Sequence, residues 1–315
     1  MIQHTDPSSG RTSSQKGSMP RSLHSLAALA ISVLQACSAA DIPQGSPLPP
    51  SGSGTGESEG TESGVMGETL VVKAHGPDGT SDQDLIGLEA EPRWATRRMF
   101  TLTRMGTVPD GLVDLEGWFT QDHEKHGNPG FEQLTYELEM GLPWRCQVDL
   151  FQVQTKTGRQ GTLDPDESGI ELDHMLANWG VIPGNPTLHA EYSVVGSDYS
   201  HLELGVLLGG SLPERVFWGA NLRCEITTGG DREHDWTASG ACGYSVSSRL
   251  TVGMEGQLED DDVAGSRGHF QSSVQLGPAI QFRPNARIHL NGECQFGVDR
   301  LAPEAVYTVI VGCAL

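Results

Sequence analysis

The stretch V-F-W-G-A-N-L-R-C-E-I, residues 216–226, decides the fold. Its even-numbered side chains are apolar and uncharged, whereas its odd-numbered positions are mostly polar and include Arg223 and Glu225. A period of two places successive side chains on opposite faces of a β-strand, so this strand meets two different environments. The same alternation returns in Trp236–Val246, Leu250–Glu259, Phe270–Phe282, Ala286–Gly297 and Tyr307–Leu315. Repeated alternating runs of about ten residues predict a transmembrane β-barrel with lipid outside and a polar lumen inside.

The composition of the 315 residues limits the alternatives. With 37% apolar and 19% charged residues, the chain is neither a helical membrane protein nor disordered throughout. It contains no run of about twenty uninterrupted apolar residues that could form a transmembrane helix. The formal net charge of −21 argues against nucleic acid as a partner, because phosphate binding requires clustered Lys and Arg.

The first 40 residues have the features of an export signal, with Met19 as an alternative start. Arg21 supplies a short basic region, Leu26–Leu34 an apolar region, and Ser38–Ala40 small residues for a signal peptidase. The sequence L-Q-A-C that ends at Cys37 also resembles a bacterial lipobox, which would make Cys37 a lipidated N-terminus. Both kinds of processing remain open at this point.

Composition and hydrophobic alternation together predict that the chain has three parts. Residues 1–40 form the signal peptide, residues 41–105 a mostly disordered linker, and residues 106–315 the barrel. The linker prediction depends on residues 41–67, which are mostly Pro, Gly, Ser and Glu and offer little to bury.

About twelve antiparallel strands are expected in an all-β fold. They cover roughly 111–121, 131–142, 146–154, 168–178, 186–194, 201–210, 214–226, 234–246, 250–259, 269–283, 286–297 and 305–315. Short turns and longer polar loops mostly alternate between them, as in outer-membrane barrels with both chain ends in the periplasm. Aromatic residues fall near both ends of the strands, which is typical of the two membrane interfaces. A soluble β-sandwich or lipocalin-like barrel is the competing interpretation, since its strands alternate as well.

The sequence from about Thr107 onward resembles a family of poorly characterised, porin-like bacterial outer-membrane β-barrel proteins. The resemblance rests on four segments, GTVPDG (106–111), FEQLTYELEMG (131–141), WGVIPGNPTLHAEY (179–192) and FWGANL (217–222). It implies a barrel fold and a location in the bacterial outer membrane, and it supplies no catalytic residues. The final strand also resembles the assembly signal of such barrels, although Leu315 stands where the family usually has an aromatic residue.

The inward face is expected to be acidic. Strand parity predicts as pore-lining Asp114, Glu116, Glu137, Glu139, Glu171, Glu191, Glu203, Arg223, Glu225, Glu255, Arg287 and Glu293, and it places Asp149, Asp173 and Glu259 on the same face. A lumen with one dominant charge sign favours a water-filled pore for small, preferentially cationic or neutral solutes. Its expected partners are outer-membrane lipid, the barrel-assembly machinery and the solutes.

Two alternatives stay open. A closed structural or binding barrel would have a lumen filled by its own ion pairs and hydrogen bonds. An outer-membrane lipid hydrolase would need a Ser–His pair, but Ser272 and His174 are far apart in strand order, and Ser200 and His201 point to opposite faces. The sequence therefore predicts no catalytic residue, and it suggests no cofactor and no metal site.

Overall fold

The computed structural model describes residues 82–315, except residues 88, 126–129, 159–160, 197–198, 213–214, 230–232 and 263–266. The expected signal peptide, the lipidation of Cys37 and the first part of the linker lie outside the described residues. Within the described part of the chain, no helix has the length and hydropathy needed to cross a bilayer.

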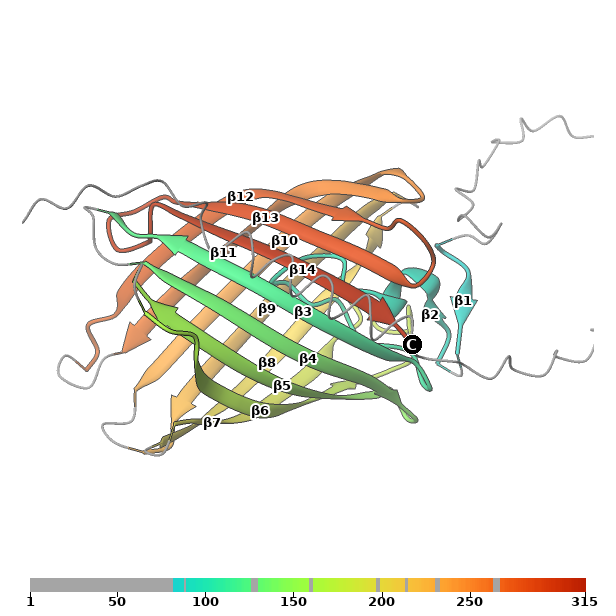
Figure 1. Cartoon of the computed structure of the whole chain (residues 1–315). Coiled ribbons are helices and arrows are strands. Elements are labelled where there is room, and N and C mark those ends of the chain that lie inside the picture. The colour runs from blue at the N-terminus through green and yellow to red at the C-terminus, as the bar shows by residue number, and fades with distance from the viewer. Residues whose placement is uncertain are drawn as a thin grey trace, which may run out of the picture.

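Twelve antiparallel strands form a closed barrel (Figure 1), which confirms the predicted fold. Each strand pairs with the next one in the sequence, and the last strand pairs with the first. The strands are β3 (Val113–His123), β4 (Phe131–Leu142), β5 (Cys146–Thr157), β6 (Asp164–Met175), β7 (Thr187–Val195), β8 (Tyr199–Leu212), β9 (Val216–Thr227), β10 (His234–Ser247), β11 (Leu250–Asp262), β12 (Gln271–Phe282), β13 (Ile288–Gly297) and β14 (Ala305–Ala314).

The two rims of the barrel differ. One rim, here called the short-turn rim, carries the turns after β4, β6, β8, β10 and β12, together with the C-terminus (Figure 1). The opposite, long-loop rim carries the connections after β3, β5, β7, β9, β11 and β13. The alternation of short and long connections is imperfect, as expected, because residues 176–186 make a long turn, whereas only three residues separate β7 from β8.

Strand alternation separates an apolar outer wall from a polar inner wall. In β9, the outward Leu222 is 52% exposed, whereas the inward Asn221 is buried. Exposed rings mark both rims: Tyr192, Trp236, Phe270, Phe296 and Tyr307 near the long loops, and Trp144, Tyr244 and Phe282 near the short turns. An apolar wall between two aromatic belts fits a lipid bilayer, so the chain is built as an outer-membrane β-barrel.

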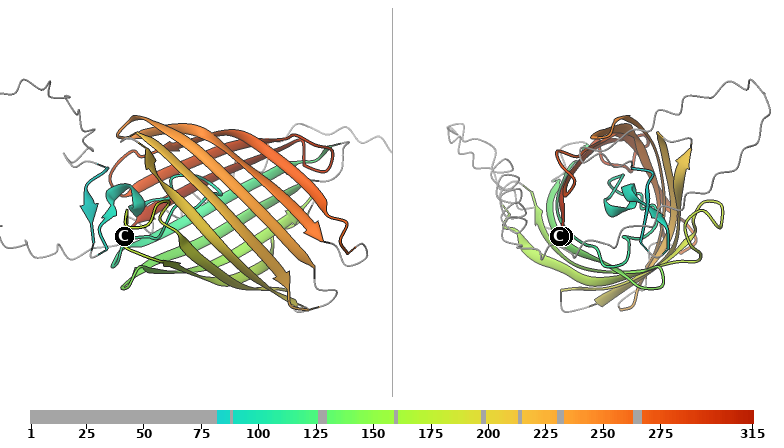
Figure 2. Two further views of the ribbon diagram at one scale, coloured as in Figure 1. Left: turned by 180° about the vertical axis from the view of Figure 1, so that it is seen from behind. Right: turned by 90° about the vertical axis from the view of Figure 1, so that its right-hand side faces the viewer.

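Residues 93–108, which precede β3, lie inside the barrel. After the two-residue strands β1 (Leu85–Ile86) and β2 (Glu91–Pro92), the short 3-10 helix η1 (Arg93–Thr96) begins a stretch that runs through the lumen. Figure 2 shows it within the ring of strands when the barrel is viewed from the short-turn rim. Residues 93–108 are called the inserted segment below. Part of the stretch expected to be a linker is therefore a packed element of the barrel interior.

Candidate functional site in the lumen

An aromatic cluster anchors the inserted segment at the short-turn rim. The Trp94 ring is almost fully buried and meets Trp179 edge-on at 5.0 Å between ring centroids, and Phe217 at 5.5 Å. Met99, Phe100 and Met105 belong to the same cluster. Buried aromatic pairs add packing energy beyond the area that they remove from water. Phe217 is an apolar residue on the polar face of β9, and its partner is this inserted segment.

Glycines in the inner wall make room for this packing. A Cβ atom added to Gly209 would lie 2.7 Å from Cβ and 3.0 Å from Cα of Met105. One added to Gly219 would lie 2.7 Å from Cγ2 of Thr103. Such distances are too short for carbon contacts, so side chains at these two positions would force the inserted segment away from the wall. The wall and the inserted segment are thus complementary in shape.

Arg98 joins the inserted segment to the acidic wall. Its guanidinium donates to Glu116 at 2.8 Å, to Glu139 at 2.9 Å and to Glu137 at 3.2 Å. Its Cζ atom also lies 4.2 Å from the centroid of the Trp118 ring, within the range of a cation–π contact. The Arg98 side chain is 2% exposed, so these ion pairs are protected from water and salt.

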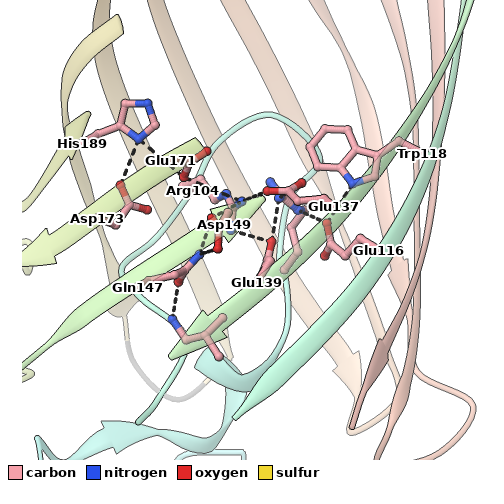
Figure 3. A network of polar contacts seen from close by, with 12 residues as sticks. Arg104, Glu116, Trp118, Glu137, Glu139, Gln147, Asp149, Glu171, Asp173 and His189 are labelled. Atoms are coloured by element: carbon pink, nitrogen blue, oxygen red, sulfur yellow. Dashed lines mark hydrogen bonds and ion pairs between the residues drawn. The ribbon is translucent and has the colours of Figure 1, made fainter. Parts of the chain in front are cut away.

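Arg104 makes a second bridge to the same wall (Figure 3). Its guanidinium lies 2.6 Å from Glu137, 2.8 Å from Glu139 and 3.3 Å from Asp149. Glu171 is farther away, at 3.9 Å. Burial alone would lower the pKa of Arg104, but the surrounding carboxylates raise it well above its usual value. Arg104 therefore remains charged inside the barrel.

Glu255 fixes the backbone of the inserted segment from the opposite wall. The amide groups of Thr101, Leu102 and Thr103 donate to its carboxylate at 2.9, 3.0 and 2.5 Å. Because the inserted segment forms no strand ladder here, wall side chains satisfy its buried amides instead. Gln147 does the same for the amide of Val108, at 2.6 Å.

A cavity of about 480 Å³ lies on the long-loop side of the inserted segment. Arg98, Leu102 and Arg104 are among its lining residues, and the lining extends to Phe131 and Pro303 near the long-loop rim. Its described lining includes three arginines, Arg98, Arg104 and Arg223, and eight acidic residues, Asp122, Glu124, Glu137, Glu167, Glu171, Glu191, Glu259 and Glu293. Acidic groups therefore still exceed basic ones in the space left for solvent.

The predicted pore-lining residues fall into three groups. Glu116, Glu137, Glu139 and Glu255 hold the inserted segment, and Asp114 lies beside Glu116. Glu171, Glu191 and Glu203 lie around His189, and Arg223 contacts Glu203 at 3.2 Å. Glu225 pairs with His201 at 2.8 Å, whereas both carboxylate oxygens of Glu293 lack a hydrogen-bond partner among the described residues.

One pore-lining residue expected from strand parity was wrong. Arg287 is exposed in the turn before β13, because that strand begins at Ile288 and not at residue 286. The neighbouring Arg283 is the buried arginine, and it donates to Asp82 at 2.9 Å. Phe131 shares the strand parity of Glu137 and Glu139 and lines the cavity near the long-loop rim.

Sequence reasoning missed Arg98 and Arg104, because it assigned residues 41–105 to a mostly disordered linker and not to the lumen. A signal was present. Residues 93–104 carry four of the 20 Lys and Arg residues of the chain, at positions 93, 97, 98 and 104. A basic run directly before a barrel with an acidic lumen is a candidate for insertion into that lumen.

The hydroxyl and imidazole groups considered for a hydrolase do not come together. Ser272 lies on β12 and His174 on β6, six strands apart around the barrel. The Oγ atom of Ser272 donates to Asp260, and Nδ1 of His174 lies 3.3 Å from Sγ of Cys146. His201 faces Glu225 and not its neighbour Ser200. None of these four residues forms a nucleophile–base pair with another.

Comparisons with known proteins agree with this architecture. A solved structure, the COG4313 outer membrane channel from Pseudomonas putida F1, aligns with 67% of this chain and 98% of its own, at a TM-score of 0.50 and 10% identity. The chain has the fold of an outer-membrane channel. The NanC porin aligns with 64% of this chain and 100% of its own, at a TM-score of 0.49 and 11% identity. The likeness to the COG4313 channel confirms the expected outer-membrane barrel fold.

The sequence comparisons are narrower. A family described as the putative MetA pathway of phenol degradation matches residues 174–304, from the end of β6 to the loop before β14. No curated protein matches the sequence.

Proposed function

We propose that this protein is a passive outer-membrane channel for small solutes, with a preference for cations and neutral molecules. The observation that carries the proposal is the cavity of about 480 Å³, whose described lining has eight acidic residues and three arginines. Fixed charges of one sign in a confined pore concentrate the opposite ion and repel the like ion. The volume of the cavity lies in the range of sites that hold small organic molecules.

The inserted segment would set the resistance of this channel. It lies across the short-turn half of the lumen, where Arg98 and Arg104 pair with wall carboxylates. A solute that enters from the long-loop rim meets this segment before it reaches the other side. We therefore expect a low single-channel conductance in the wild-type protein, with rare larger openings when the segment shifts.

Conductance of the purified full-length protein in a planar lipid bilayer tests the proposal. Under a KCl gradient at low salt, the reversal potential should show that K⁺ passes more readily than Cl⁻, and the preference should weaken as salt rises. A reversal potential with the sign expected when Cl⁻ passes more readily than K⁺ would contradict the proposed selectivity.

A closed structural barrel is the second candidate, favoured by the same ion pairs and by the apolar cluster around Trp94. The two candidates differ in one measurement. A channel conducts in the wild-type form, whereas a closed barrel does not conduct until the inserted segment has been displaced.

A further inference from the structure

A cluster of one histidine and several carboxylates lies in the wall of the cavity, away from the ion pairs of Arg98. Glu171 and Asp173 are two residues apart on β6 and therefore share its inward face. His189 of β7 is the cross-strand partner of Asp173, and Glu203 reaches the same imidazole from β8. Three neighbouring strands thus direct their side chains to one point.

The potential ligand atoms of this cluster lie close enough together to share one metal ion. The Nδ1 atom of His189 lies 2.9 Å from Oδ1 of Asp173 and 3.5 Å from Oε1 of Glu171 (Figure 3). The three ligand atoms lie within 4.8 Å of one another. Ligands bound at about 2.1 Å to a common cation are themselves separated by roughly 3.0–3.5 Å.

The second imidazole nitrogen is already oriented. Nε2 of His189 lies 3.0 Å from Oε1 of Glu203, so a proton on Nε2 can be donated to that carboxylate. Nδ1 faces Asp173, its hydrogen-bond partner at 2.9 Å, and a bound cation would take the place of the proton between them. A carboxylate that orients a metal-binding histidine in this way is a common feature of metal sites.

An unpartnered oxygen points to a missing ligand. Asp173 is fully buried, yet its Oδ2 atom has no hydrogen-bond partner among the described residues. A proton on Nδ1 of His189 would satisfy only Oδ1 of Asp173. A cation at this place would contact both carboxylates and the imidazole, and it would offset the charge of Asp173, which has no arginine within ion-pair distance among the described residues.

We propose that Glu171, Asp173 and His189 bind a divalent transition-metal cation of the zinc type, with Glu203 as the residue that orients His189. One imidazole nitrogen with carboxylate oxygens is a ligand set that suits such ions. This site does not depend on whether the barrel conducts, so it goes beyond the proposed channel. The spacing of these residues in the sequence does not predict the metal site, because the ligands come from different strands.

A cation could reach this cluster from the cavity. Glu171 and His189 both line that space. The similar group of Asp114, Glu116 and His289 does not line it, and Glu116 is occupied by Arg98 at 2.8 Å. Access from the cavity distinguishes the first cluster from the second, and its arginine contact is longer, at 3.9 Å from Arg104 to Glu171.

Titration of the purified, EDTA-treated full-length protein with ZnCl₂ by calorimetry tests the proposal. We expect one site per chain. Asp173→Asn and His189→Gln should abolish it, and Glu203→Gln should weaken it by about 10- to 100-fold. His201→Gln is the matched control, because His201 also pairs with a carboxylate, at 2.8 Å, but belongs to no such cluster. Circular dichroism checks that each variant is folded.

The proposal is overturned if wild-type protein binds no zinc, or if zinc binding survives in folded Asp173→Asn and His189→Gln. If these variants do not fold, the visible absorption spectrum of wild-type protein with added CoCl₂ tests the site instead. A visible absorption band typical of mixed nitrogen and oxygen ligands supports the site, and its absence overturns it. Loss of zinc binding with unchanged conductance would leave the channel proposal intact, so the two can fail separately.

Discussion

The two halves of the lumen have the same wall chemistry and different contents. In the short-turn half, Glu137 and Glu139 are buried against arginines of the inserted segment. In the long-loop half, Glu191 and Glu259 line a cavity. Strand alternation directs carboxylates inward along the whole height of the barrel. The difference between the halves therefore comes from residues 93–108 and not from the strands.

This comparison explains how an acidic lumen can be partly closed. Buried ion pairs add little net stability, because desolvation of the charges offsets their attraction, but removal of one partner is costly. The arginines therefore specify where the inserted segment lies. The glycines opposite Met105 and the aromatic cluster around Trp94 supply the shape and the apolar contact.

The largest effect is expected from replacing both Arg98 and Arg104 with Ala. Each removal leaves buried carboxylates unpaired, at a cost of about 3–5 kcal/mol. The inserted segment should leave its place, and the short-turn half should resemble the long-loop half. Single-channel conductance should rise several-fold, measured in planar bilayers. Arg287→Ala is the control, because Arg287 is exposed in a turn, and it should conduct like wild type. Unchanged conductance in the double variant would show that the inserted segment does not limit flow.

A smaller effect is expected from Trp94→Ala, which leaves the ion pairs intact. Loss of a buried tryptophan costs about 3–5 kcal/mol when the surroundings cannot collapse. The inserted segment should open more often, so trypsin should cleave after Arg97, Arg98 or Arg104 in detergent-solubilised protein, whereas these bonds resist in wild type. Equal resistance of the variant and the wild type would mean that the arginines alone hold the inserted segment.

The sequence predicts the barrel far better than its contents, for a physical reason. Strand β4 (Phe131–Leu142) has the predicted bounds, because alternation is a local signal that each strand carries by itself. The inserted segment has no such period. Its place depends on pairs distant in sequence, such as Arg98 with Glu139, 41 residues later. Arg287 shows the same limit on a small scale, since a shift of two residues in the start of β13 moves it out of the lumen.

A third variant, Gly209→Ala, tests the shape of the wall. The new Cβ would lie 2.7 Å from Cβ of Met105, and such overpacking typically costs about 1–3 kcal/mol. Trypsin cleavage in the inserted segment should increase modestly, less than in Trp94→Ala. The control is Gly240→Ala on the exposed outer face, where the nearest atom is 3.8 Å away. If trypsin cleaves both variants equally, the close approach of Gly209 and Met105 does not determine where the inserted segment lies.

The smallest expected effect concerns ion preference in the long-loop half. Glu137, Glu139 and Glu255 are unsuitable targets, because they hold the inserted segment and their replacement would change two properties at once. Glu191→Gln with Glu259→Gln instead removes two cavity charges and leaves the contacts of Arg98 and Arg104 in place.

This double variant should conduct about as well as wild type but show a reversal potential shifted toward zero under a KCl gradient at low salt. The shift should vanish near 1 M salt, where the screening length is about 3 Å and fixed charges no longer act across the cavity. Glu304→Gln, which changes an exposed carboxylate in the loop before β14, is the control and should leave the potential unchanged. A shift of equal size in the control would place the selectivity in the outer loops. No shift in either variant would mean that ions are selected at the inserted segment, so that the filled half of the lumen, and not the open half, determines which solutes pass.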